Sequence, residues 1–167
     1  FTSSIVQDHP FNFARRMSSL DHYTEGRLGW NIVTSFNENM FRSFGHEGTL
    51  AHDERYRWAD EYVDVVYKLW EGSWDEDALV QDKERGLHSD PAKVHKINHA
   101  GPRYRVEGPH FSSPSPQRTP VIFQAGSSPA GQLFSARNAE GVYIGSPTQA
   151  DAYTLTTETR ALAAQHG

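Results

Sequence analysis

The stretch LGWNIVTSF, residues 28–36, is a nearly continuous apolar run that ends in the small polar residues Thr34 and Ser35. Gly26 lies just before it, and a segment rich in Asn, Gly and Phe follows it. A short apolar run of this kind is typical of a strand that is buried on both faces of a parallel sheet. The run therefore predicts an α/β fold with a central parallel sheet.

The segments around this strand alternate between the two kinds of secondary structure. The chain opens with FTSSIV, a short β-prone stretch, and residues 11–27 then place Phe13, Met17 and Leu20 at helical spacing. We predict that Gly26 ends this helix. A longer helix is predicted from about residue 51 to Gly72, because one apolar stripe runs along it: Ala59, Tyr62, Val66, Leu69 and Trp70.

The same alternation resumes in the C-terminal part of the chain. Residues 120–128 (PVIFQAGSS) predict a strand, 129–141 a helix with Pro129 near its first turn, 142–147 (VYIGSP) a strand, and 148–167 an amphipathic helix. Between residues 73 and 120 the composition shifts to charges, His, Pro and Gly. Within that insertion KINHAGPRYRVEG predicts a hairpin around an Ala-Gly-Pro turn.

This order predicts about four strand–helix units with one hairpin-containing insertion. Such alternation specifies either an open doubly wound sheet or an arc of a (β/α)₈ TIM barrel. The sequence contains no GxGxxG or GxxxxGK[ST] loop, so nothing in it directly supports a dinucleotide or nucleotide-triphosphate site.

Composition narrows the classes of function. The chain has 167 residues, of which 37% are hydrophobic, enough for one domain with a core. Its net charge of −5 offers no basic stripe, so we expect no nucleic-acid partner. It has no cysteine, which excludes disulfides and thiolate metal sites and fits a cytoplasmic setting. No apolar run approaches the ~20 residues of a membrane helix.

The candidate binding residues follow the predicted strands, because ligands of parallel α/β folds bind at the carboxyl ends of the strands. These ends are small, polar and uncharged, which suits a neutral aromatic ring system better than a metal. Ser127 and Ser128 precede Pro129 at the start of a predicted helix. They either bind a phosphate there or simply cap the helix, and both uses have the same geometry.

His52 and Tyr56 lie four residues apart at the start of the long helix and therefore share one face of it. The positive end of the helix dipole disfavours an imidazolium, so we expect His52 to be neutral and able to donate or accept a hydrogen bond. We predict that Asp53 caps the helix, and the alternative to a site role for His52 is that it is a surface residue.

We predict no metal site. His95 and His99 are four residues apart, but within a hairpin this spacing separates side chains by about 13 Å at ~3.3 Å per residue. HDERY, residues 52–56, lacks the second histidine of the HExxH zinc motif.

Four long blocks of the chain resemble one protein family, in the order and approximate spacing of that family. The family is the bacterial-luciferase-like flavin monooxygenases, in the branch of nitrilotriacetate and dibenzothiophene-sulfone monooxygenases. The blocks are ARRMSSLDHYTEGRLGWNIVTS, HDERYRWADEYVDVVYKLWEGSW, DPAKVHKINHAGPRYRVEGPH and SPSPQRTPVIFQAGSSPAG.

The resemblance implies a luciferase-like TIM barrel and a two-component monooxygenase. Such enzymes use reduced FMN (FMNH₂), supplied by a separate flavin reductase, and O₂ to oxidise a small organic substrate at a carbon next to N or S. The cofactor carries the difficult chemistry, so no catalytic residue is assigned and the protein's role is to hold and shield it. The resemblance also implies a homo-oligomer for the full-length protein.

The resemblance carries over to individual residues. His52 and Tyr56 match positions at which the family contacts flavin, and Ser128 matches the serine of its QAGxSPxG block. Ser127 ranks below Ser128, and Thr2 corresponds less securely to a flavin-contacting threonine. Asn31 and Thr34 are candidates for lining the site.

We expect the chain to be an internal piece of a longer protein, a single partial barrel domain over residues 1–167 with its insertion at about 73–120. It begins without methionine, and a complete barrel needs at least ~250 residues. We therefore expect the chain alone to bind FMN weakly or not at all. The alternatives are a non-catalytic remnant, a flavin-binding module, or a luciferase-like reductase that uses a deazaflavin.

Overall fold

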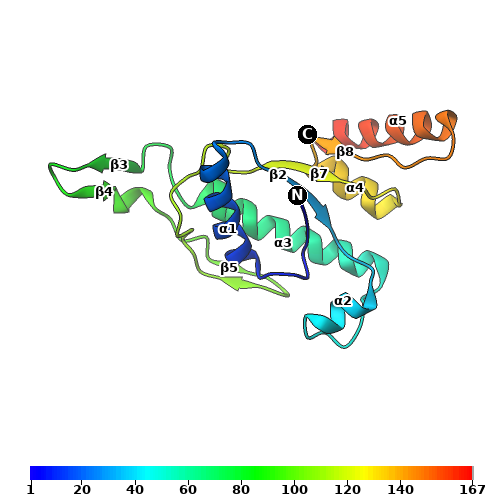
Figure 1. Ribbon diagram of the computed structural model, residues 1–167, viewed down its shortest axis with the longest axis horizontal. Helices are drawn as coiled ribbons and strands as arrows, with labels where there is room; N and C mark the ends of the chain where they lie inside the picture. Colours follow the sequence, from blue (N-terminus) through cyan, green and yellow to red (C-terminus); the bar gives the residue numbers. More distant parts are fainter. Residues whose placement is uncertain (167) are drawn as a thin grey trace. The chain divides into compact units, whose positions relative to one another are not determined.

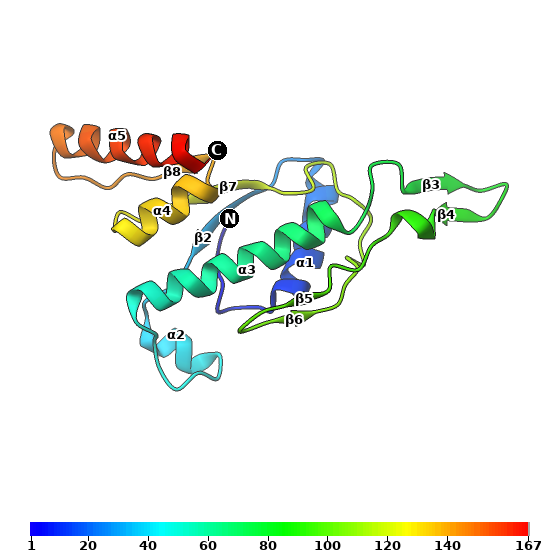
Figure 2. The same ribbon diagram turned by 180° about the vertical axis from the view of Figure 1, so that it is seen from behind.

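The computed structural model describes residues 1–166, and their contacts divide the chain into two compact units. The first, here called the sheet unit, contains residues 1–7, 29–60 and those from Val121 onwards. The second, the hairpin unit, contains residues 8–28 and 61–120. Helix α3 (His52–Gly72) contributes to both and is drawn as one uninterrupted helix (Figure 2).

A parallel sheet of four strands in the order β1-β2-β7-β8 forms the centre of the sheet unit. Its strands are β1 (Thr2–Ser4), β2 (Gly29–Val33), β7 (Val121–Gln124) and β8 (Gly141–Val142), and β2 and β7 lie side by side (Figure 1). The predicted parallel α/β fold is therefore confirmed.

Strand β2 is buried more fully on one face than on the other. Trp30 and Ile32 are completely buried, whereas Gly29, Asn31 and Val33 are half-buried. Successive side chains of a strand point to opposite faces of the sheet, so Trp30 and Ile32 share the buried face. The prediction that both faces are buried was therefore wrong for the face that carries Asn31 and Val33. The alternation also places Thr2, Asn31 and Phe123 in one row across three strands.

Three further helices belong to the sheet unit: α2 (Glu38–Ser43), α4 (Pro129–Asn138) and α5 (Gln149–His166). Helix α2 was not predicted; the Asn37 side chain caps it by accepting from the backbone N–H groups of Asn39 and Met40. Helix α5 was predicted as amphipathic, but within residues 149–166 only Thr159 is buried. The last predicted strand is shorter and begins earlier, at Gly141 instead of Val142.

The hairpin unit packs helix α1 (Pro10–Thr24) against the C-terminal part of α3. The Phe13 and Tyr62 rings lie 5.8 Å apart, and the Trp70 indole N–H donates to the Ala14 carbonyl at 3.2 Å. The predicted apolar stripe of α1 is wrong at its last position, because Leu20 is 44% exposed and Asp21 is buried in its place.

The buried Asp21 carboxylate accepts the backbone N–H of Gln117 at 2.8 Å, so it connects α1 to the segment before β7. Helix α1 ends as predicted near Gly26, where Glu25 and Gly26 both have positive φ (53° and 77°). Glu25 is the left-handed residue at the end of the helix, and Gly26 continues the chain at a positive φ that costs glycine no steric energy.

Two antiparallel hairpins occupy the predicted insertion: β3 (Leu79–Asp82) with β4 (Leu87–Ser89), and β5 (His99–Ala100) with β6 (Arg105–Val106). A short 3₁₀ helix, η1 (Pro91–Lys93), lies between them. The second hairpin was predicted and the first was not.

A half-buried carboxylate of α3 holds the turn of the predicted hairpin. Glu61 accepts the backbone N–H groups of Arg103 (3.1 Å) and Tyr104 (2.9 Å) and lies 3.2 Å from His99 Nε2. Burial alone would raise the pKa of Glu61, but these donors outweigh it, and its pKa is lowered. Glu61 therefore stabilises the hairpin as a charged acceptor above its ordinary pKa, and this contribution is lost as the pH falls below that range.

Candidate site at the carboxyl ends of the strands

A cavity of about 500 Å³ lies at the carboxyl ends of β2 and β7, within the sheet unit. It is formed by the end of β2 and the loop after it, Met40 of α2, the first turns of α3, and the loop after β7. Its lining residues are Ile32, Val33, Thr34, Ser35, Phe36, Asn37, Met40, His52, Arg55, Tyr56, Gln124, Ala125 and Gly126. The lining is largely apolar, and Arg55 carries its only permanent charge.

His52 and Ser128, which are 76 residues apart in the sequence, meet beside this cavity. His52 Nε2 lies 3.1 Å from Ser128 Oγ, and His52 Nδ1 lies 2.7 Å from the Asp53 carboxylate. A carboxylate can only accept, so in the neutral imidazole Nδ1 carries the proton and Nε2 accepts from the Ser128 hydroxyl. His52 is thus fixed as an acceptor toward Ser128.

Ser128 also caps helix α4, because its Oγ accepts the backbone N–H of Gly131 at 3.1 Å. The two uses considered for Ser128, capping and membership of a polar site, therefore occur together. Asp53 was predicted as a cap of α3, and this is wrong: the helix begins at His52, so Asp53 lies in its first turn and pairs with His52. A carboxylate in the first turn still interacts favourably with the helix dipole.

Tyr56 fixes the approach of the β7 loop to helix α4. Its ring is 9% exposed and lies 5.1 Å from the His52 ring. Its hydroxyl lies beside two glycines: a Cβ on Gly126 would be 2.5 Å from it, and a Cβ on Gly131 would be 2.7 Å from it. A Cβ on either glycine would also be 2.9 Å from the Cα atom of the other, so neither position has room for a side chain.

This close packing predicts the effect of one added methyl group. Gly126→Ala is expected to lower the free energy of unfolding by about 1–3 kcal/mol, because overpacking forces neighbouring atoms to shift. Gly145→Ala is the matched control: its Cβ would meet no heavy atom within 4 Å. Urea denaturation of both variants measures the difference, and equal stability of the two would show that the Tyr56 packing is not as tight as described.

Of the other predicted residues, only some lie at this cavity. Thr2 is exposed and its hydroxyl accepts from the Asn31 side-chain amide at 3.2 Å, on the face of the sheet. Both line a separate hollow of about 350 Å³ on that face. Ser127 is exposed and does not line the strand-end cavity, whereas Thr34 does.

Sequence reasoning gave Arg55 no role, and it included Gln124 only as one of the residues at the ends of the predicted strands. Arg55 lies inside the HDERY block, between His52 and Tyr56, and its position there was the available signal. Gln124 is the last residue of β7 and is 4% exposed. Its side-chain carbonyl accepts from the Ser135 hydroxyl at 2.9 Å and from the Gly126 backbone N–H, so it shapes the loop that lines the cavity.

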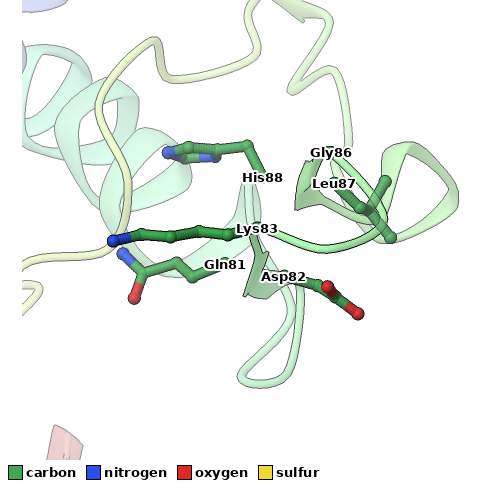
Figure 3. A pocket seen from close by; sticks show the side chains of 6 residues that line it. All are labelled: Gln81, Asp82, Lys83, Gly86, Leu87 and His88. Atoms are coloured by element: carbon green, nitrogen blue, oxygen red, sulfur yellow. The ribbon is translucent and has the colours of Figure 1, made fainter.

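A further hollow of about 460 Å³ lies on the β3–β4 hairpin of the other unit. Figure 3 shows Gln81, Lys83 and His88 extending to one side and Asp82 and Leu87 to the other. It is built by one exposed hairpin and includes no strand end of the parallel sheet.

The histidines considered for a metal site have separate partners. His95 Nε2 lies 2.9 Å from Asp75, and His99 lies between Glu61 and Asp64. Residues 1–166 contain no group of three or more His, Asp or Glu side chains placed to hold a metal ion. None of the helices in this range combines the length and apolar character that crossing a membrane requires.

Comparison with known proteins gives a consistent result over the whole chain. The family model described as luciferase-like monooxygenase matches residues 2–167. A long-chain alkane monooxygenase from Geobacillus thermodenitrificans is 54% identical over 144 residues, 86% of this chain and 33% of that protein. Component A of nitrilotriacetate monooxygenase from Aminobacter aminovorans is 40% identical over 166 residues, 99% of this chain and 36% of that protein.

Solved structures agree with the sequence relatives. The crystal structure of a riboflavin lyase with modified FMN and substrate riboflavin superimposes with a TM-score of 0.92 at 45% identity, covering 98% of this chain and 36% of that one. The predicted resemblance is confirmed. The chain spans about a third of the length of the curated relatives described here.

Proposed function

The chain belongs to the luciferase-like monooxygenase family, and we propose that it supplies the strand-end part of the reduced-FMN site of a two-component monooxygenase. One observation carries the proposal: His52 and Ser128 meet at 3.1 Å beside a largely apolar cavity at the carboxyl ends of β2 and β7. Ligands of parallel α/β folds bind at this end of the sheet.

The residues present fit FMN, which joins a flat ring system to a ribityl chain and a phosphate. The apolar part of the lining suits the ring, and the first turns of α3 and α4 bring the side chains of His52 and Ser128 to its polar rim. Tyr56 packs beneath His52 and keeps it in place. Ser127 and Thr2 remain proposed flavin contacts of lower rank.

When bound, reduced FMN supplies the activation of O₂, and the chain's own residues bind, orient and shield it. His52 and Ser128 would contact the flavin at the polar rim of the cavity, and Phe36, Met40 and Ile32 would exclude water from its apolar wall. No residue of the chain is assigned a bond-making step.

A flavin reductase is the proposed partner, because one similar protein is named as component A of its monooxygenase. We propose a small organic substrate oxidised at a carbon next to N or S. Relatives at 40% and 54% identity are named for nitrilotriacetate and for long-chain alkanes, so identity alone does not select the substrate. A homo-oligomer remains a prediction for the full-length protein.

Titration with FMN, followed by the backbone amide resonances, tests the site. We expect binding weaker than micromolar, with shifts confined to the His52, Tyr56 and Ser128 region. His52→Ala is expected to weaken FMN binding at least about fivefold, roughly 1 kcal/mol, because one polar contact is lost. His88→Ala is the matched control, since His88 lines the hollow in Figure 3 instead.

Three results would contradict this proposal: no shifts at saturating FMN, shifts centred on residues 81–88, or equal effects of the two histidine variants. Catalysis is tested separately, by O₂-dependent substrate oxidation with a flavin reductase present. Binding at the expected residues without turnover would favour a non-catalytic flavin-binding module.

A further inference from the structure

The second residue after β2, at the rim of the cavity, has an unusual backbone. Ser35 has a φ of +57°, in the left-handed region that residues other than glycine and asparagine rarely adopt. It lines the cavity together with its neighbours Thr34 and Phe36. A strained residue of this kind persists only where its surroundings hold it in place.

Arg55 supplies one of these restraints. Its Nη1 donates to the Ser35 carbonyl, which connects the first turns of α3 to the end of β2. The Ser35 hydroxyl supplies the others, since its Oγ lies 2.7 Å from Ser4 Oγ and 3.1 Å from Met40 Sδ. Ser4 is 2% exposed at the end of the neighbouring strand β1, so it is a fixed anchor.

The burial of Arg55 indicates that its position is specific. An arginine on a helix surface normally keeps its guanidinium in water. Arg55 is only half-exposed, and its Nε is buried without a hydrogen-bond partner among the described residues. Leaving a charged donor buried and unpaired is costly, so the contact with Ser35 must contribute enough to offset it.

We propose that Arg55 is a positioning residue that holds Ser35 in its left-handed conformation and thereby fixes residues 34–37 as one wall of the cavity. Phe36 and Met40 belong to that wall, and Phe36 is 83% exposed at its rim. The part of this inference that concerns ligand affinity rests on the proposed FMN site, whereas the conformational part does not.

Glycine at position 35 provides the decisive test, because glycine adopts a positive φ without steric cost. Arg55→Met is expected to remove the strong intraresidue NOE between the amide and Hα protons of Ser35, the NMR sign of a positive φ. It should also weaken FMN binding about tenfold, the size of one left-handed residue's strain. In the Ser35→Gly background, Arg55→Met should change affinity by less than about threefold. Ser35→Ala is the control, because it removes the hydroxyl but keeps the Cβ, so it should not rescue Arg55→Met.

The outcomes separate this inference from the proposed function. If no variant binds FMN but Arg55→Met still abolishes the Ser35 NOE, the FMN site is wrong and the positioning role stands. If Arg55→Met leaves the NOE intact, the positioning role is overturned. If it weakens FMN binding equally in the Ser35 and Ser35→Gly backgrounds, Arg55 acts directly on the ligand and the inference is also overturned.

Discussion

Trp30→Ala is expected to lower the free energy of unfolding by about 3–5 kcal/mol, the usual cost of removing a large buried aromatic side chain. Trp30 is completely buried in β2, the strand between β1 and β7, so the cavity left behind lies in the centre of the sheet unit. Its indole N–H also donates to the Ser3 carbonyl at 3.2 Å, so the substitution removes a link between two strands. Chemical denaturation monitored by circular dichroism measures the loss.

Two companion variants separate burial from the presence of an aromatic ring. Trp30→Phe keeps most of the apolar volume and should cost clearly less than Trp30→Ala. Tyr153→Ala removes an aromatic ring that is 74% exposed and should change stability by no more than about 0.5 kcal/mol. A loss from Trp30→Ala as small as that from Tyr153→Ala would contradict the assignment of β2 to the core.

The strand and helices that could be predicted from the sequence are those with a long enough hydrophobic pattern. Residues 28–33 carry an apolar run, and α3 carries an apolar stripe from Ala59 to Trp70, so both elements were predicted correctly. Helix α2 has six residues, too few for a period to be visible, and its signal is the local cap at Asn37. The prediction that Leu20 is buried was wrong for a related reason. A helical period of 3.6 residues allows either position 20 or position 21 to face the core, and the hydrogen bond from the Gln117 backbone N–H favours burial of Asp21.

The candidate site shows a different limit of sequence reasoning. The spacing of His52 and Tyr56 was readable, since four residues in a helix place two side chains on one face. That Ser128 meets His52 depends on the pairing of β2 with β7, which no local pattern encodes. The role proposed for Arg55 depends on the φ of Ser35, a property that only the folded chain reveals.

The free energy of unfolding is expected to fall by about 3 kcal/mol as the pH is lowered from 6.5 to 4, because of one histidine. Burial, with a smaller contribution from Arg15, lowers the pKa of His110 from 6.5 to about 4. The folded protein therefore leaves His110 neutral over a range in which the unfolded chain binds a proton. Since the unfolded state binds more protons there, stability is fully present above pH 6.5 and declines as the pH falls.

The surroundings of His110 explain why it resists protonation. It is 2% exposed, its Nε2 lies 2.8 Å from the Ser18 hydroxyl, and its Nδ1 is buried without a partner among the described residues. Its backbone is held on both sides, by the Ser73 hydroxyl at 3.0 Å and by the Trp74 indole at 2.9 Å. Within residues 1–166 no carboxylate is hydrogen-bonded to the ring to stabilise a positive charge, so a second proton would create an unpaired charge in the core.

His110→Gln isolates this contribution, because glutamine can still hydrogen-bond to Ser18 but does not titrate. The difference between wild type and His110→Gln should change by about 2 kcal/mol between pH 7 and 5, a window above the range in which Glu61 becomes protonated. Urea midpoints at several pH values measure it, and His88→Gln on the exposed hairpin should follow the wild-type curve. Parallel curves for wild type and His110→Gln would mean that His110 takes up its proton in the folded state as easily as in the unfolded chain. The buried environment described for its ring would then be wrong.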